Sequence, residues 1–188
     1  DYGGQINALL VDTTYVYALG NTTSRIRRYL KSDLSYDSQA AAFSGACHSL
    51  TMDSTHIYAG GATLANPLTR RVRKYLKSDL SYITQSSAYD GWIFSMVNQG
   101  DFIYIGGGVA GETTSTIQKL NKSDLTLAEE SGPYGDAIND LIIVGDYIYA
   151  GGDNVNALRK YLTSDLSFIS QGAPYGGRIW SLAHAPVN

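Results

Sequence analysis

The sequence predicts an all-β protein assembled from repeated copies of one four-stranded unit. Three recurring anchors support this prediction. The tripeptide Ser-Asp-Leu begins at Ser32, Ser78, Ser123 and Ser164, and the tyrosine that ends a Tyr-X-Tyr motif or its equivalent is Tyr17, Tyr58, Tyr104 or Tyr149. An aromatic residue followed closely by glycine recurs at Tyr2, Phe43, Tyr89, Tyr134 and Tyr175. Each anchor recurs every 41 to 46 residues, and self-similarity at such a period indicates a repeat architecture.

The composition agrees with a strand-rich chain. The 188 residues include 20 glycines, 15 tyrosines and 4 prolines, and charged residues make up 16%. Aromatic residues favour strands and glycine favours tight turns, whereas disorder, a coiled coil or collagen requires a different composition. A helical interpretation fails because no unit keeps a 3.6-residue apolar period for three turns.

The second unit shows why each strand is expected. Residues 46–53 (ACHSLTMD) and 55–61 (THIYAGG) predict the first two strands, and residues 70–77 (RRVRKYLK) and 80–87 (LSYITQSS) predict the last two. Each segment is short, contains β-branched or aromatic residues and is bounded by turn residues. Asp and Ser in the sequences DST and KSD bond back to the local backbone, and the Gly-Gly pair permits the bend after the second strand.

A four-stranded unit of about 40 to 45 residues has the size of a propeller blade. We therefore predict a β-propeller of four four-stranded antiparallel blades, followed by the inner strand of a fifth. The predicted repeats cover residues 2–42, 43–88, 89–133 and 134–174, with a partial repeat at 175–188. Together they are expected to form a single domain over residues 1–188.

The repeat pattern YIYAGG…RKYLKSDLS…YGG.I.SL resembles the broad superfamily of quinoprotein-like and kelch-like propeller repeats. The resemblance covers essentially the whole chain and implies architecture rather than a particular function. The chain lacks the Gly-His and Trp-Asp pairing of WD repeats, the Trp-docking motif of quinone-dependent dehydrogenases and the Asp-box of sialidases. The resemblance therefore implies no inherited catalytic residues.

The phase of the repeat leaves three arrangements open. The chain begins at the end of one unit and stops inside the first strand of another. Closed propellers have about four to eight blades, so four blades could close alone, but the extra inner strand would then have no place in the ring. Alternatively, the chain is part of a larger ring, or two chains associate into one ring through their open blade edges.

The inner strands begin on the face where the loops differ between units, and they line the predicted central channel. Side chains two residues apart on a strand point the same way. The mouth of the channel therefore collects aromatic rings, amides, a histidine and an arginine: Gln5, Asn7, His48, Trp92, Phe94, Asn139, Arg178 and Trp180. Aromatic faces beside amides suit sugar rings or other small polar ligands. The competing interpretation is that the large rings only pack between blades.

The third strand of each unit carries basic residues. They are Arg27 and Arg28, Arg73 and Lys74, Lys119 after Gln118, and Arg159 and Lys160. We interpret them as partners of the turn aspartates Asp33, Asp79, Asp124 and Asp165, rather than as a stripe that binds phosphate or sulfate groups.

Catalytic and metal-binding patterns are absent from the sequence. The three histidines and Cys47 do not form a zinc spacing. A nucleophilic triad needs a histidine oriented by a carboxylate, but no carboxylate pairs with His48 in sequence, His56 lies next to a turn and His184 lies near the end of the sequence. We therefore predict no metal, no cofactor and no catalytic residue. The net charge of −3 argues against a nucleic-acid partner, and no apolar run approaches the roughly 18 residues of a membrane span.

These observations predict a non-catalytic propeller scaffold for binding or assembly. Carbohydrate or surface recognition is the preferred version, and a structural module of a larger extracellular or virion-associated protein is a related one. The expected partners are a carbohydrate or protein ligand, a second copy of the chain or further blades of a longer chain. An extracellular or virion-surface location is favoured. The alternative is a hydrolase or lyase with its site at the channel mouth, which would need an acid/base group there.

Overall fold

The computed structural model describes residues 4–21, 25–43, 45–63, 66–109, 111, 113–153 and 157–184. These residues form four four-stranded antiparallel sheets, each a blade. Blade 1 contains β1 (Ile6–Val11), β2 (Tyr15–Gly20), β3 (Arg27–Leu30) and β4 (Tyr36–Gln39). Blade 2 contains β5 (Ala46–Met52), β6 (His56–Thr63), β7 (Asn66–Leu76) and β8 (Tyr82–Gln85). Blade 3 contains β9 (Trp92–Gln99), β10 (Phe102–Gly108), β11 (Gln118–Asn121) and β12 (Leu127–Glu130). Blade 4 contains β13 (Ile138–Val144), β14 (Tyr147–Gly152), β15 (Arg159–Leu162) and β16 (Phe168–Gln171).

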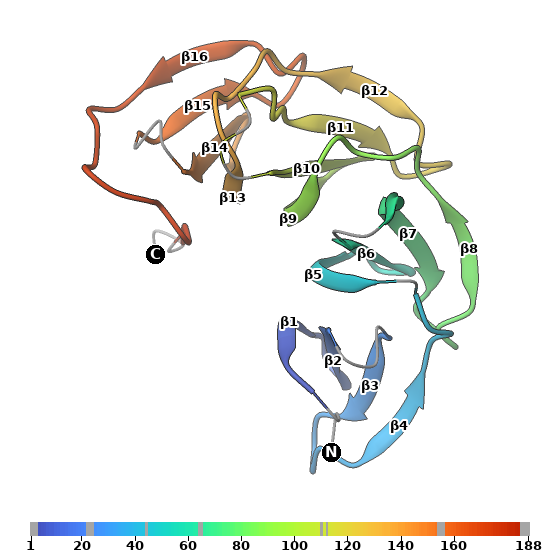
Figure 1. The fold of residues 1–188 in the computed structure, drawn as a ribbon. Helices are drawn as coiled ribbons and strands as arrows, with labels where there is room; N and C mark the ends of the chain where they lie inside the picture. The colour runs from blue at the N-terminus through green and yellow to red at the C-terminus, as the bar shows by residue number, and fades with distance from the viewer. Residues whose placement is uncertain are drawn as a thin grey trace.

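The four blades stand side by side in an open arc, which confirms the predicted four-bladed propeller architecture (Figure 1). The strands β1, β5, β9 and β13 lie on the concave side, and β4, β8, β12 and β16 form the outer rim. Neighbouring inner strands contact each other along the arc, but β1 contacts no strand of blade 4. Within the described residues, no helix is long and apolar enough to cross a membrane.

The Ser-Asp-Leu turn has the same conformation in every blade. Asp33 Oδ1 accepts a hydrogen bond of 2.9 Å from the Ser35 amide, and the equivalent aspartates do the same. The leucine that follows has a positive φ in each case: Leu34, Leu80, Leu125 and Leu166, with φ of 57°, 61°, 63° and 59°. A bulky residue such as leucine rarely adopts a positive φ. Another interaction must therefore offset the free-energy cost of this backbone conformation.

In blades 2 to 4, burial of the turn leucine between blades compensates for this strain. Leu80 packs in the same apolar cluster as Tyr17 of blade 1. The pairs Leu125 with Tyr58 and Leu166 with Tyr104 repeat the arrangement at the next two junctions. The turn leucine therefore connects each blade to the one before it, which explains why the tripeptide recurs.

The basic residues of the third strands also connect the blades, but their partners differ from the predicted ones. Arg28 Nη1 donates to the carbonyl oxygens of Lys77 and Ser78, each at 2.9 Å, in the turn of blade 2. Lys74 and Lys119 reach the corresponding turns of blades 3 and 4. The prediction that they pair with Asp33, Asp79, Asp124 and Asp165 was wrong, because those carboxylates are used by amides of their own turns.

The segment of residues 175–184, called the C-terminal segment below, lies against blade 4. The Ile179 amide donates to the Gly152 carbonyl at 3.1 Å, and the Leu182 amide donates to Asp140 Oδ2 at 2.7 Å. The segment occupies the place of a fifth inner strand, as predicted, but the structure assigns no strand to its described residues. No second strand of a fifth blade lies beside it there to complete a ladder.

Candidate functional site

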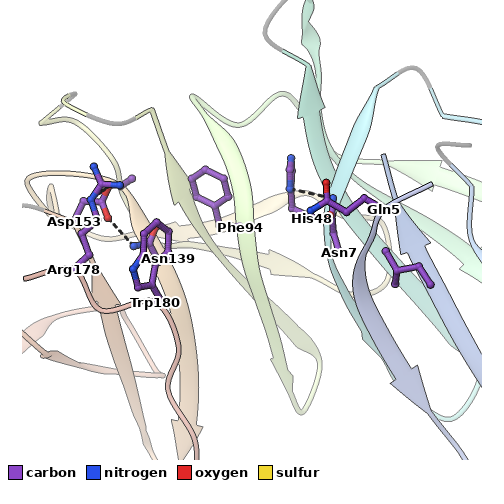
Figure 2. A pocket seen from close by; sticks show the side chains of 10 residues that line it. Gln5, Asn7, His48, Phe94, Asn139, Asp153, Arg178 and Trp180 are labelled. Carbon is purple, nitrogen blue, oxygen red and sulfur yellow. Dashed lines mark hydrogen bonds and ion pairs between the residues drawn. The ribbon is translucent and has the colours of Figure 1, made fainter. Parts of the chain in front are cut away.

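A cavity of about 490 Å³ opens on the concave side of the arc. Its walls come from the inner strands of blades 1 to 4 and from the C-terminal segment (Figure 2). The lining residues are Gln5, Ile6, Asn7, His48, Phe94, Ala137, Asn139, Asp153, Arg178 and Trp180. The structure thus brings seven of the eight predicted mouth residues together; the exception is Trp92.

The blade 1 end of the cavity is a cluster of amides. The Asn7 side-chain amide donates to Asn21 Oδ1 and to the Cys47 carbonyl, the latter at 2.8 Å. Asn21 in turn donates to Gln5 Oε1 at 3.2 Å. These bonds hold the Asn7 side chain toward blade 2, so the amide groups at this end have fixed orientations.

The blade 4 end repeats this arrangement with a charge added. Asn139 Nδ2 donates to Asp153 Oδ1 at 2.7 Å and to the Ile179 carbonyl at 3.1 Å. The other oxygen of the buried Asp153 carboxylate lies 3.5 Å from Arg178 Nε. The Arg178 guanidinium also lies over the Trp180 ring, 5.5 Å from its centroid. The paired charges therefore position the exposed Trp180 at the edge of the cavity.

Aromatic rings occupy the middle of the cavity wall. The His48 ring stacks on Trp92 with centroids 5.1 Å apart and meets Phe94 edge-on at 5.8 Å. Asn7 Nδ2 lies 3.4 Å from His48 Nδ1, while the buried His48 Nε2 has no hydrogen-bond partner. Burial lowers the pKa of His48 below its ordinary value of 6.5, so the ring is neutral at pH 7. Trp92 is not among the lining residues, and it contacts the cavity wall through His48 and Phe94.

Sequence reasoning missed Asp153. The signal was present, because Asn7 and Asn21 are separated by the same 14 residues as Asn139 and Asp153. The loops that differ between units lie partly outside the described residues, at 22–24, 64–65, 110, 112 and 154–156. In the described part, the β6–β7 hairpin of blade 2 extends to the pair Thr63 and Asn66.

The described lining contains little for acid–base chemistry. Asp153 is its one carboxylate, and Arg178 and Asn139 already bind both oxygens. Asp140 lies on the other face of β13 from Asn139, where it accepts a hydrogen bond of 2.8 Å from Ser95 Oγ. Within the described residues, no group of three or more His, Cys, Asp or Glu side chains could hold a metal ion.

No protein-family model matches this chain, and no curated protein matches it in sequence. Its fold is similar to solved structures. The computationally designed Ika8 protein aligns with a TM-score of 0.78 and 9% identity over 97% of this chain and 54% of that one. The WD40 repeats of RRP9 align with a TM-score of 0.72 and 10% identity over 87% and 50% of the two chains. The designed Ika4 protein aligns with a TM-score of 0.70 and 11% identity over 85% and 91%.

The fold is that of a β-propeller. At these identities the similarity shows the fold alone, and the chain spans about half the length of the Ika8 and RRP9 chains. The similar structures include WD40 repeats, so the sequence resemblance is confirmed for the propeller architecture and not for the quinoprotein-like or kelch-like superfamily in particular.

Proposed function

We propose that this chain is a non-catalytic binding module whose concave mouth binds a carbohydrate. The observation that carries this proposal is the composition of the cavity wall, in which amide clusters at both ends flank aromatic rings. A cavity of about 490 Å³ lies within the range of roughly 300–1,000 Å³ for sites that take small molecules. It would therefore take one or two sugar rings.

Each part of the wall matches one feature of a sugar. Asn7 and Asn139 use their N–H groups within the protein, so their side-chain carbonyl oxygens would accept hydrogen bonds from sugar hydroxyl groups. The faces of Phe94 and Trp180 would cover the C–H side of a pyranose. The ion pair of Arg178 with Asp153 fixes the position of the Trp180 ring without leaving an uncompensated charge.

The lining favours binding over hydrolysis. Glycoside hydrolysis uses two carboxyl groups on either side of the scissile bond, one of them free to move a proton. The described lining supplies only Asp153, which is engaged on both oxygens. The alternative of a hydrolase or lyase at the mouth therefore has no observation in its favour.

Tryptophan fluorescence tests the proposal directly. The chain has two tryptophans, so Trp92→Phe leaves Trp180 as the only one. We expect titration with a panel of methyl glycosides and N-acetylglucosamine to quench or shift this emission for at least one sugar. A subsequent glycan array would identify the preferred oligosaccharide.

Variants locate the binding site on the molecule. Trp180→Ala and Asn139→Ala should each weaken sugar binding at least tenfold, because they remove a stacking face and an amide. Tyr36→Ala is the matched control, since Tyr36 is also an exposed ring but lies on the outer strand β4. Equal binding by all three variants, or no response to any sugar at millimolar concentration, would overturn the proposal.

A further inference from the structure

The two ends of the arc carry complementary halves of the contact that joins neighbouring blades. The turn leucines Leu80, Leu125 and Leu166 are at most 2% exposed, and each shares a buried apolar cluster with a tyrosine of the preceding blade. Leu34 of blade 1 is 63% exposed, because no blade among the described residues covers it. At the other end, Tyr149 is only partly buried, whereas the equivalent tyrosines of blades 1 to 3 are fully buried.

The basic side chains show the same complementarity. Lys74 Nζ donates to the carbonyls of Lys122 and Ser123 in the next blade, at 2.6 and 3.1 Å. The equivalent residue of blade 4, Lys160, reaches no carbonyl in the described part of the chain and lies over the Tyr147 ring at 3.6 Å. The equivalent carbonyls of blade 1 are those of Lys31 and Ser32, in the turn between β3 and β4. Blade 1 is the first blade of the arc (Figure 1).

The inner strand adds an apolar component to the junction. Inside the arc, Ile93 and Met96 of β9 pack on Gly60 of the preceding blade, and Ile138 and Leu141 pack on Gly106. The equivalent side chains of β1 are those of Ile6 and Leu9, which are 45% and 59% exposed. Blade 1, at the end of the arc, therefore lacks three contacts that each junction between neighbouring blades contains.

We propose that a second copy of this chain docks its blade 1 on blade 4, and that two such junctions close a ring of two chains. Leu34 of the second copy then packs on Tyr149, and Lys160 donates to the carbonyls of Lys31 and Ser32 of that copy. The occupant is a second copy because its surface repeats each feature of the existing junctions. The number is two because the chain spans about half the length of the propeller structures Ika8 and RRP9.

The C-terminal segment competes with this docking. Its sequence GGRIWSL corresponds to GGQINAL of β1, so Ile179 and Leu182 are the equivalents of Ile6 and Leu9. Both side chains pack on Gly151, which is the surface that β1 of a second copy would cover. The segment therefore closes blade 4 within the same chain and has to leave before the ring can form.

Displacement of the C-terminal segment by a second copy also changes the residues at the mouth of the channel. Arg178 and Trp180 leave with the C-terminal segment, and Gln5 and Asn7 of the second copy take their places beside Asn139 and Asp153. The completed ring thus has a mouth of amides and lacks the exposed tryptophan. The docking of two copies does not depend on the carbohydrate proposal, since it follows from the blade junction alone.

Assembly mass tests the inference with the full chain. By native mass spectrometry and light scattering over a concentration series, we expect a monomer–dimer equilibrium. Ile179→Asp weakens the hold of the C-terminal segment on Gly151 and should strengthen the dimer at least tenfold. Leu34→Asp and Lys160→Met should each weaken it at least tenfold. Leu127→Asp is the matched control, because Leu127 is similarly exposed on the outer strand β12.

Cross-linking gives a second test that does not depend on the Ile179 variant. With a short bis-maleimide, the double variant Leu34→Cys, Tyr149→Cys should give a covalent dimer in denaturing electrophoresis, since these positions lie at opposite ends of one arc. The single variants Leu34→Cys and Tyr149→Cys are the controls, and each should remain a monomer under the same treatment. The native Cys47 does not interfere, because it is buried and burial raises the pKa of its thiol to about 12.

Three results would overturn the inference. The first is a monomer at all concentrations for both the natural chain and Ile179→Asp, with no cross-linked dimer. The second is an assembly of a number of chains other than two. The third is a dimer that Leu34→Asp and Lys160→Met leave unchanged, which would place the contact elsewhere.

Discussion

Gly60 of β6 lies directly against Ile93 of β9, and a Cβ at residue 60 would come within 2.7 Å of Ile93 Cγ2. At the junction between blades 1 and 2, the sizes of the side chains at the two equivalent positions are reversed. There Leu19 stands in the place of the glycine and Cys47 in the place of the isoleucine, and both are buried in one cluster. A large residue on one blade is thus matched by a small one on the next, which explains the single buried cysteine.

Gly60→Ala should destabilise the fold by about 1–3 kcal/mol, because the added methyl overpacks the junction against Ile93 and Met96. Thermal and urea unfolding measure the loss. The double variant Gly60→Ala, Ile93→Val should recover part of it by making room. Gly132→Ala is the control, since a Cβ there meets no atom within 4 Å. Equal stability of the two glycine variants would show that the junction can expand without cost.

Lys74→Met should cost about 1–3 kcal/mol of unfolding free energy, because two carbonyls of the next blade lose their charged donor. Lys160→Met is the matched variant at the end of the arc, where the lysine binds no carbonyl among the described residues. Its cost should stay below about 0.5 kcal/mol in the monomeric chain. Urea titration at low protein concentration compares them, and similar losses would contradict the assigned role of the carbonyls.

Substitution of a turn leucine by glycine should change the stability by different amounts at Leu80 and at Leu34. Leu80→Gly removes a buried side chain and should cost about 2–5 kcal/mol, although it relieves the positive φ. Leu34→Gly relieves the same strain at an exposed position, so its effect on the monomer should stay within about 1 kcal/mol of zero. Thermal unfolding of both variants separates backbone strain from burial. A large loss for Leu34→Gly would mean that the side chain already has a partner in the monomer.

Stability should fall as the pH drops below about 6.5, and His48 should account for part of the fall. Burial lowers the pKa of His48 in the folded state, so the unfolded chain binds a proton first as the pH decreases. The contribution is fully present above the ordinary pKa of 6.5 and is lost as the pH falls toward the folded value. The melting temperature of His48→Phe should therefore decline less between pH 6.5 and about pH 5 than that of the natural chain.

The aspartates titrate in a separate window. Burial alone would raise the pKa of Asp53, but hydrogen bonds from the Thr55 amide and the Tyr58 hydroxyl, among others, outweigh it and lower the pKa to about 2. The stability that Asp53 contributes is therefore lost only as the pH falls below the ordinary aspartate pKa of 3.8.

His184→Gln serves as the control for His48→Phe, since residue 184 is exposed. An unchanged slope in His48→Phe would remove the histidine from the explanation.

The repeat made the blades predictable because each strand and turn depends on local chemistry. Asp33 binds an amide two residues away, so the Ser-Asp-Leu turn can be recognised from a few residues. The partners of Arg28 and Lys74 could not be predicted in this way, since the acceptors are backbone carbonyls 48 to 50 residues away. A carbonyl has no sequence signature, and the nearby aspartates were a misleading alternative.

The candidate site was predictable in part for the same reason. Alternation along the inner strands placed Asn7, His48 and Asn139 on one side, and the structure agrees. Alternation alone does not say which rings line the cavity, and Trp92 stacks on His48 without being one of the lining residues. Asp153 was missed because it lies at the end of β14 rather than on an inner strand.

The open arc also gives the chain a direction in which it loses structure. Blade 1 is covered on one side only, whereas blades 2 and 3 have neighbours on both sides and blade 4 is covered by the C-terminal segment. Local opening requires less free energy where fewer contacts are broken. Amide hydrogen exchange should therefore be fastest in β1 and β2, slower in the equivalent strands of blade 4 and slowest in β6 and β10. A protease that acts on transiently opened chain should accordingly cut first before residue 43.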